Sequence, residues 1–217
     1  MNIIELRHTN SVLNNYLAEI RNVDIQKDPL RFRCNIERIG SLMAYEVSKH
    51  LDYALCDITT PLGIAQVHLP KDNIVVGSIL RAGLPMHNGV LDIFDRAENC
   101  FISAYRKYSS DTDFDIELEY VATPSLEGKV LLLADPMLAT GKSLAKTIVA
   151  LQRYGKPRHI HVLNIIGSPE GVEHLRKELS GTDITVWIVA IDEHLNEHKY
   201  IVPGLGDAGD LAFGKKL

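Results

Sequence analysis

Two kinds of hydrophobic pattern divide the chain. Over roughly the first fifty residues, apolar side chains recur at steps of three and four, along 12–20 and again along 36–51, which predicts amphipathic helices. Beyond them, runs of Val, Ile and Leu have the length of strands at 74–76, 130–134, 160–166 and 184–191, and helical patterns lie between them at 84–94, 144–151 and 172–179. This alternation of strand and helix predicts an α/β fold with a parallel sheet covered on both faces.

Two local features refine this scheme. Apolar and acidic residues alternate strictly along 114–120, a period of two that predicts an edge or hairpin strand with one face in water. The polar residues 109–113 before it are expected to form a mobile loop. Ser168 followed by Pro169 predicts the N-cap and the first residue of the helix over 172–179.

Composition narrows the class of protein. The chain has 217 residues, of which 46% are hydrophobic, and 23 basic against 28 acidic side chains give a net charge of −5. This balance excludes a disordered chain, three cysteines exclude a disulfide scaffold, and no apolar run has the roughly 18 residues that a membrane span needs. The N-terminus has no pattern of a targeting peptide, and the absence of a basic stripe argues against nucleic acid as a partner. We therefore expect a cytoplasmic protein, and the lack of repeats and linkers favours a single domain.

The segment 130–143 carries the strongest chemical signal. A buried strand ends in Asp135, small residues follow, and a helix is expected to start at about Thr140. Ligands of open α/β folds bind at this edge of the sheet and helix N-termini bind anions, so the segment predicts a phosphate site. Residues 141–143 also match the second half of a P-loop, but Pro136 stands where that motif needs its first glycine. The remaining alternative is that this segment only connects a strand to a helix and has no role in binding.

A glycine-rich motif lies near the C-terminus. Residues 204–209 match the G-x-G-x-x-G pattern of dinucleotide-binding folds, but such a site needs a helix and a second strand after the motif, and only eight residues follow Gly209. The three glycines around Asp207 instead predict a loop whose backbone approaches a ligand and hydrogen-bonds a flat polar ring. A plain glycine turn is the alternative.

Two arginines at predicted strand ends complete the candidate chemistry. Arg81, followed by Ala82 and Gly83, can offer a guanidinium and backbone amides to a polyanion such as diphosphate. Arg106, at the end of another predicted strand, can supply a second positive charge. A solvated surface arginine is the simpler interpretation of either residue alone, so the interpretation depends on the strand ends lying together.

Taken together, these motifs resemble those of the uracil phosphoribosyltransferase family. The resemblance runs along nearly the whole chain, through 31–33, 39–42, 79–84, 135–141 and 201–210. The last two segments are specific, because phosphoribosyltransferases for purines or orotate differ there. The resemblance implies one phosphoribosyltransferase domain over 1–217, with a parallel-sheet core, flanking helices and a β-hairpin flap. It also implies a hood built from both chain ends, about 1–55 and about 192–217.

The resemblance further implies a role for each candidate residue. Arg81 and Arg106 would contact the diphosphate of phosphoribosyl diphosphate (PRPP), and a flap over 107–114 would close over the reacting centre. Asp207 would face PRPP, and Asp207 and Arg106 are the candidate catalytic residues. Uracil would be bound by Ile201, Gly206, Asp207 and Ala208, mainly through their backbone. The PRPP loop, with its last five residues near the 5-phosphate and its first residue at the ribose hydroxyls, would comprise Asp135, Pro136, Met137, Leu138, Ala139, Thr140, Gly141, Lys142 and Ser143.

The implied activity is the conversion of uracil and PRPP to uridine monophosphate (UMP) and diphosphate in pyrimidine salvage. Mg²⁺ held mainly by substrate oxygens is the implied cofactor, and no metal site made by the protein alone is expected. Because relatives are dimers or larger and GTP activates some of them, a homodimer or homotetramer is implied and GTP is a candidate effector. The rival hypothesis is a pyrimidine-sensing regulator that keeps the fold and binds RNA, which a net charge of −5 does not favour.

Two positions depart from the family pattern. Lys142 stands where many relatives have a glycine, and Ser78 stands where relatives usually have a proline. A side chain at position 142 strains the loop if its φ must be positive, and otherwise its ammonium group adds to phosphate binding. We favour the second hypothesis, which predicts that Lys142→Gly raises the KM for PRPP.

Overall fold

An eight-stranded sheet forms the centre of the molecule. The structure, a computed structural model, describes residues 1–108 and 114–216, with the backbone alone at 104–108 and 114–119. The strands run in the order β1 (Asn2–Glu5), β10 (Ile184–Ile191), β9 (His159–Gly167), β7 (Val130–Ala134), β4 (Ile74–Leu80), β5 (Glu98–Tyr108) and β6 (Phe114–Ala122), and the short β8 (Met137–Leu138) pairs with β9. Neighbouring strands are parallel except β6, which runs antiparallel to β5 at one edge. The predicted α/β fold and the edge strand are therefore confirmed, whereas the expected loop at 109–113 lies outside the described residues.

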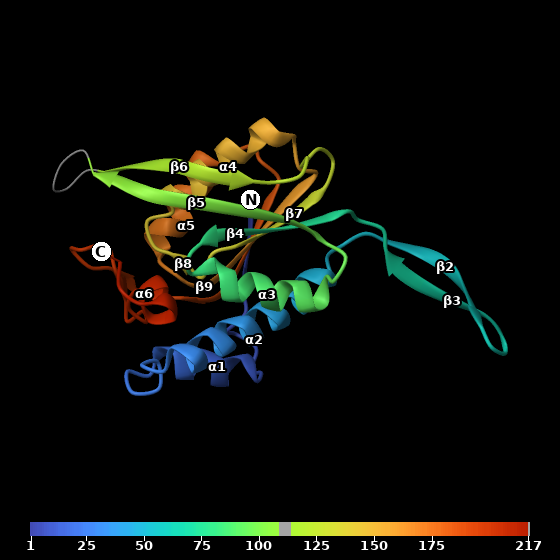
Figure 1. The fold of residues 1–217 in the computed structure, drawn as a ribbon, viewed down its shortest axis with the longest axis horizontal. Coiled ribbons are helices and arrows are strands. Elements are labelled where there is room, and N and C mark those ends of the chain that lie inside the picture. The colour runs from blue at the N-terminus through green and yellow to red at the C-terminus, as the bar shows by residue number, and fades with distance from the viewer. Residues whose placement is uncertain (109–113, 217) are drawn as a thin grey trace.

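Helices cover both faces of this sheet (Figure 1). On one face lie α1 (Leu13–Arg21), α2 (Pro29–Ser48) and α3 (Gly83–Ile93), and on the other lie α4 (Lys142–Leu151), its 3-10 extension (Gln152–Tyr154) and α5 (Pro169–Glu178). Successive residues of β7 enter opposite cores, since Leu132 packs in the core of α2 and α3, and Leu131 and Leu133 pack in the core of α4 and α5. A strand buried on both faces needs an apolar side chain at every position, which explains the unbroken run at 130–134.

Capping residues determine where the helices begin. Ser168 accepts a hydrogen bond from a backbone amide of α5 and Pro169 is the first helical residue, as predicted. Asp28 caps α2 in the same way, so that this helix starts at residue 29, ahead of the start predicted at 36. The start of α4 is later than predicted, at residue 142, because Gly141 before it has a left-handed φ of 73°.

Several elements were not predicted from the sequence, among them β1 and the hairpin of β2 and β3. β1 pairs with β10 at the edge of the sheet, so the expectation of a mostly helical N-terminal part is incomplete. β2 (Tyr53–Thr60) and β3 (Gly63–Pro70) form an antiparallel hairpin that extends away from the sheet (Figure 1). We refer to residues 53–70 as the arm.

The C-terminal segment packs beside α2 and α3. It contains the small hairpin of β11 (His194–Leu195) and β12 (Ile201–Val202), followed by α6 (Ala208–Phe213). Leu205, Ala208 and Ala212 are buried in the same core as α2 and α3, and the Arg33 guanidinium donates to the carbonyl of Ala212 at 2.7 Å. Within the described part of the chain, no helix has both the length and the apolar character that crossing a membrane requires.

Candidate active site

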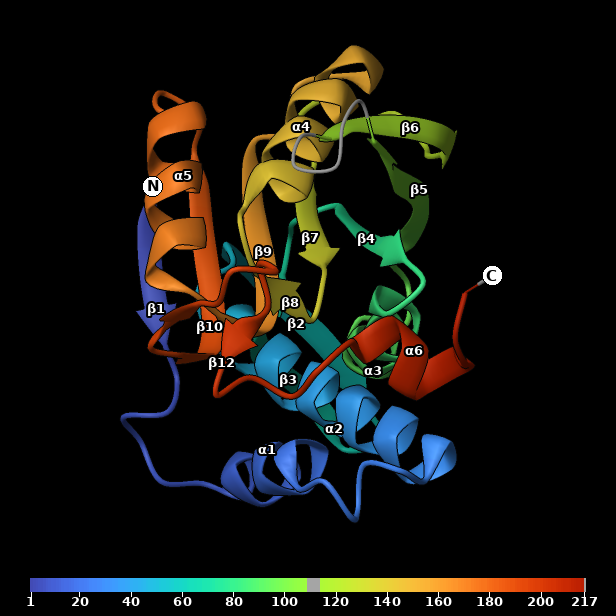
Figure 2. The same cartoon turned by 90° about the vertical axis from the view of Figure 1, so that its left-hand side faces the viewer.

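The carboxyl ends of the parallel strands place the candidate residues at one edge of the sheet. Arg81 directly follows β4, Asp135 follows β7 and Asp192 follows β10. The C-terminal segment with β12 and α6 passes the same edge (Figure 2). Because crevices at this edge bind the ligands of open α/β sheets, these residues are candidates for one common site.

Asp135 has its backbone held by β9 and its carboxyl group partly buried. Its amide donates to the carbonyl of Leu163 at 3.1 Å, and its carbonyl accepts a hydrogen bond from Nδ2 of the buried Asn164 at 2.5 Å. Burial raises the pKa of the Asp135 carboxyl to about 7, against the opposing effect of the Met137 amide that bonds to it at 3.3 Å. A carboxyl group that carries its proton close to neutral pH can both donate to and accept from hydroxyl groups of a ligand.

The loop after Asp135 is packed tightly onto the start of α5. The hydroxyl of Ser168 donates to the carbonyl of Ala139 at 2.7 Å. Gly141 has a φ of 73°, and a Cβ atom there would lie 2.6 Å from the carbonyl oxygen of Gly171. Beyond this turn α4 starts without a side-chain cap from Gly141, and the amide of Lys142 donates to Oγ1 of Thr140 at 3.4 Å. The N-terminus of a helix is a place where backbone amides can bind an anion. The structure therefore brings together the features of the predicted phosphate loop.

Lys142 is the first residue of α4 and is exposed. The positive φ of this turn belongs to Gly141, and among the described non-glycine residues only Lys199 has a positive φ. A side chain at position 142 therefore causes none of the backbone strain considered from the sequence.

The turn at Arg81 lies directly against the end of β7. A Cβ atom on Gly83 would lie 2.6 Å from the carbonyl oxygen of Ala134 and 2.8 Å from Oγ of Ser78, so only glycine allows this approach. Ser78 is fully buried, and its hydroxyl has no hydrogen-bond partner among the described residues. This packing sets the turn at Arg81 beside the backbone that leads into Asp135.

Arg81 also contacts the C-terminal segment. Its guanidinium donates to Oδ1 of Asp210 at 3.0 Å and to the carbonyl of Gly214 at 3.1 Å, while its Nε atom is buried without a partner among the residues described. A Cβ atom on Gly209 would lie 3.2 Å from Oδ1 of Asp207 and 3.6 Å from a terminal nitrogen of Arg81. The predicted diphosphate residue and the predicted uracil segment are thus neighbours.

The segment 201–208 leads into α6, which contacts Arg81 through Asp210. The side chains of Ile201 and Ala208 are buried, whereas Gly206 and Asp207 between them are exposed. Gly206 has a φ of 95°, and Oδ1 of Asp207 accepts a hydrogen bond from the amide of Asp210 at 2.9 Å, which caps α6. Between the buried ends of this segment, Gly204 and Leu205 are also buried, and Gly206 and Asp207 are the adjacent pair of exposed residues.

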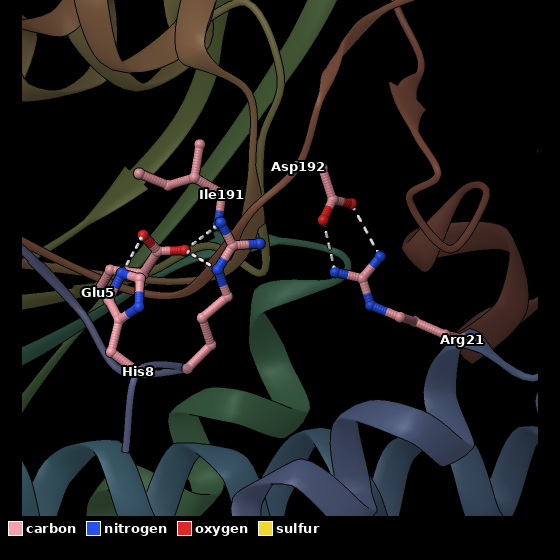
Figure 3. Close-up of polar contacts among 6 residues, drawn as sticks. Glu5, His8, Arg21, Ile191 and Asp192 are labelled. Carbon is pink, nitrogen blue, oxygen red and sulfur yellow. Dashed lines mark hydrogen bonds and ion pairs between the residues drawn. The ribbon is translucent and has the colours of Figure 1, made fainter. Parts of the chain in front are cut away.

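Three charged residues outside the predicted site hold the start of the C-terminal segment (Figure 3). Arg21 on α1 forms a two-pronged ion pair with Asp192 at 2.7 and 2.8 Å. Glu5 of β1 accepts a hydrogen bond from the amide of Ile191 at 2.9 Å and is paired with Arg7. Sequence reasoning missed these residues, although Asp192 shares with Asp135 the pattern of an acidic residue directly after a buried strand.

Comparison with known proteins shows to which family this chain belongs. Residues 8–215 match the family model described as uracil phosphoribosyltransferase. The chain belongs to the uracil phosphoribosyltransferase family. A uracil phosphoribosyltransferase of Porphyromonas gingivalis is 51% identical over the full length of both chains, and one of Methanothermobacter thermautotrophicus is 42% identical over 87% of this chain and 86% of its own. The solved structure of the AQ2163 protein from Aquifex aeolicus is 26% identical, with a TM-score of 0.87 and 98% of each chain covered. The predicted family and enzyme class are confirmed.

Two predictions for this member of the uracil phosphoribosyltransferase family fall on a part of the chain that is described incompletely. The backbone of Arg106 lies in β5 opposite Ile116 of β6, and its side chain is outside the described atoms. The predicted flap over 107–114 includes residues 109–113, which also lie outside the described part. The catalytic role of Arg106 therefore stays a prediction.

The carboxyl groups at the carboxyl edge of the sheet could supply a few of the oxygen ligands of a Mg²⁺ ion. No group of three or more His, Cys, Asp and Glu side chains suited to a metal occurs among the residues that the structure describes. Asp135 and Asp207 each offer a carboxyl group at this edge, the oxygen chemistry that Mg²⁺ prefers. One or two carboxylates are the usual protein share of a Mg²⁺ ion that is otherwise bound by phosphates and water.

Proposed function

We propose that this enzyme transfers the phosphoribosyl group of PRPP to N1 of uracil, with UMP and diphosphate as products, and so salvages uracil. The observation that carries the proposal is the convergence of three segments at the carboxyl edge of the sheet. Gly83 packs against the end of β7 beside Asp135, and Arg81 bonds to Asp210 in the segment that contains Asp207. These contacts support a single site in which Arg81 would bind the diphosphate, the first turn of α4 the phosphate and the C-terminal segment the planar ring.

The PRPP side of the proposed site consists of the loop 135–143 and the two arginines. The amides at the start of α4, with the hydroxyls of Thr140 and Ser143 nearby, would bind the 5-phosphate. Asp135 would bind the ribose hydroxyls, and Arg81 with Arg106 would bind the diphosphate. Pro136 supports the loop, because its carbonyl accepts hydrogen bonds from two amides of β9 at 2.9 and 3.0 Å.

The uracil side consists of the backbone at Ile201, Gly206 and Ala208. Backbone amides and carbonyls would pair with the edge of the ring, and this pattern would discriminate against cytosine, whose exocyclic amine reverses one donor and acceptor position. Asp207 is exposed between these residues and would face PRPP. We propose it as the candidate acceptor of the proton that uracil N1 loses.

The reaction needs charge stabilisation more than a nucleophile of the enzyme. The bond between uracil N1 and C1 of the ribose forms as the bond from C1 to the diphosphate oxygen breaks, and the electron pair leaves with the diphosphate. Arg81 and Arg106 would stabilise the negative charge that grows on this leaving group. Bound Mg²⁺ would further neutralise the diphosphate, and Asp135 and Asp207 would offer carboxyl groups to hold it.

The decisive experiment mixes the purified protein with labelled uracil, PRPP and Mg²⁺ and follows UMP by chromatography. We expect UMP and diphosphate in equal amounts, and far less UMP from Asp207→Asn. Cytosine in place of uracil is the substrate control and should give no nucleotide product. Absence of UMP at micromolar protein would contradict the proposed function and favour the RNA-binding regulator, which a gel-shift experiment with RNA would test directly.

We also propose that the enzyme acts as one domain over 1–217 and as a homodimer or homotetramer, in which the arm binds a second copy of the chain. One face of the arm is apolar across its paired positions, and Ile58, Val67 and Leu69 there are 38%, 41% and 40% exposed. An isolated two-stranded hairpin is marginally stable in water, so this face needs a cover. Val67→Asp should lower the mass measured by light scattering, whereas His68→Asp on the opposite face should leave it unchanged. An unchanged mass for Val67→Asp would contradict this use of the arm.

Two finer proposals rest on the resemblance to the family alone. GTP is proposed as an effector and the cytoplasm as the location. Addition of GTP to the UMP assay at limiting PRPP should raise the rate, and an unchanged rate up to millimolar GTP would contradict the proposed activation. Fractionation of cells should recover the protein with soluble cytoplasmic enzymes.

A further inference from the structure

The C-terminal segment is attached to α1 by a buried group of polar contacts. The two terminal nitrogens of Arg21 donate to the two carboxylate oxygens of Asp192 at 2.7 and 2.8 Å, so the ion pair is two-pronged (Figure 3). Arg21 also donates to the carbonyl of Gly204 at 3.0 Å, and the amide of Gly204 donates to Asp192 at 2.9 Å. Both backbone polar groups of Gly204 are therefore bonded to this ion pair. We refer to Arg21, Asp192 and Gly204 as the clasp.

Burial makes these contacts strong and directional. The side chain of Asp192 is 3% exposed and that of Arg21 is 22% exposed. A charge with so little access to water depends on its partner, and the planar guanidinium matches a carboxylate in a single orientation. The clasp therefore holds Gly204 in one position relative to α1.

Gly204 occupies the point of the chain from which the proposed uracil-binding backbone is positioned. It lies between Ile201 and Gly206 and has a φ of 60°, and a Cβ atom on it would overlap the carbonyl oxygen of Ile201, so there is no room for a side chain. On the far side of the clasp, Glu5 bonds to the amide of Ile191, which fixes the end of β10 next to Asp192. The loop 201–208 is thus held at its base by residues of the N-terminal segment.

We propose that Arg21 and Asp192 are positioning residues for uracil, which act through Gly204 on the backbone of Ile201, Gly206 and Ala208. This inference rests on the proposed function, since it assigns the loop 201–208 to the base. Among the residues that the structure describes, the polar contacts of the side chains of Arg21 and Asp192 lie within the clasp and include neither the loop 135–143 nor Arg81. Its loss should therefore weaken uracil binding selectively, because a loosened loop no longer presents its amides and carbonyls in register with the ring edge.

The test measures the KM for uracil and for PRPP separately in the full-length enzyme. For Arg21→Gln we expect the KM for uracil to rise on the order of ten- to a hundredfold, the scale that a misplacement near 1 Å can cause, while the KM for PRPP changes less than threefold. Asp192→Asn should act in the same direction. The double variant should be no worse than the poorer single variant, because the two residues act as one unit.

The control variant is Arg31→Gln. It removes another two-pronged ion pair, in which Arg31 of α2 donates to Glu19 of α1 at 2.7 Å by both prongs. In the described part of the chain, the side chain of Arg31 forms no hydrogen bond or ion pair with the C-terminal segment. A general loss of stability would lower kcat by reducing the folded fraction in either variant, and it would leave the KM values alone. Both KM values of Arg31→Gln should stay within twofold of the wild type.

Arg21→Lys is the second variant in case Arg21→Gln does not fold. Lysine keeps the charge but cannot bond to both carboxylate oxygens and to Gly204 in the same geometry, so the KM for uracil should rise at least threefold. A KM for uracil within twofold of the wild type in every folded clasp variant would overturn the positioning role while the proposed function stands. Absence of UMP with the wild-type enzyme would overturn both.

Discussion

The sharpest test of the proposed phosphate loop is the substitution Gly141→Ala. Gly141 has a φ of 73°, a conformation that costs an L-residue roughly 1–2 kcal/mol. The added Cβ would also lie 2.6 Å from the carbonyl oxygen of Gly171, closer than any ordinary contact. Forcing extra atoms into a packed place costs roughly 1–3 kcal/mol. We expect Gly141→Ala to lower the free energy of unfolding by about 2–4 kcal/mol after a few tenths are returned by the stiffer unfolded chain.

Gly128→Ala is the matched control for this experiment. Gly128 has a nearly identical φ of 68°, but a Cβ atom there meets no other atom within 4 Å. The control therefore carries the conformational cost alone, about 1 kcal/mol, and the difference between the two variants isolates the contact with Gly171. Urea unfolding followed by the circular dichroism of the helices measures both free energies.

The same pair of variants tests function. To relieve the clash the loop 139–143 must move away from α5, which shifts the first amides of α4 with it. The KM for PRPP should rise at least tenfold in Gly141→Ala and stay within twofold of the wild type in Gly128→Ala, with little change in the KM for uracil in either. If Gly141→Ala were as stable and as active as Gly128→Ala, the contact with Gly171 would not determine the position of the loop and the reasoning would be refuted.

Three further predictions concern titration and the departure at position 142. Burial raises the pKa of the Asp135 carboxyl from 3.8 to about 7, so the folded state keeps a proton that the unfolded chain releases above pH 4. The free energy of unfolding should therefore fall by at most about 4 kcal/mol between pH 4 and pH 7. Asp135→Asn should reduce this dependence on pH, as measured by urea unfolding at pH 5 and pH 8. The pKa of His161 is lowered from 6.5 to about 3, first by burial and then by nearby positive charge. The free energy of unfolding should therefore reach its full value above pH 6.5 and fall as the pH drops toward 3. His161→Gln should lose less of this free energy than the wild type between pH 7 and pH 4. Lys142→Gly should raise the KM for PRPP about three- to tenfold, because it removes a charge worth of order 1 kcal/mol beside the first turn of α4, and an unchanged KM would contradict a role for the ammonium group.

The sheet was predictable from the sequence because its strands are buried on both faces. At 130–134 every residue is apolar, since alternate side chains enter the two cores on either side of the sheet. The start of α5 was also predictable, because Ser168 and Pro169 act through local hydrogen bonding and a local φ that need no tertiary context. Signals of this kind are contained within a few neighbouring residues.

The arm and β1 were not predictable in the same way. In the arm, apolar residues point to both faces and much of their surface is exposed, so neither strict alternation nor an unbroken run appears along 53–70. The dipeptide Pro61-Leu62 at the tip of the arm could have suggested a hairpin, because a two-residue turn between two possible strands is typical of a β-hairpin. β1 has four residues, too few for a periodic pattern, and its pairing with β10 depends on residues far away in the sequence.

In the candidate site, too, short-range features could be predicted from the sequence and long-range contacts could not. The loop 135–143, the turn at Arg81 and the glycines at 204–209 could be proposed from the sequence, because each combines small or charged residues within a short stretch of the chain. The clasp was not found, since Arg21 and Asp192 are 171 residues apart and no spacing relates them. Contacts that position a loop from a distant helix become visible only when the fold is known.

The net charge of the enzyme indicates that the proposed site must bind a polyanion through local positive groups. The net charge of −5 offers no general attraction for PRPP, so the positive groups must be local. Arg81 is already paired with Asp210 and its buried Nε atom has no partner among the described residues. A diphosphate that binds Arg81 would therefore take the place of the Asp210 carboxylate as its anionic partner. In the proposed function this exchange would release Asp210, a residue of α6, from Arg81, and so would link the binding of PRPP to the position of α6.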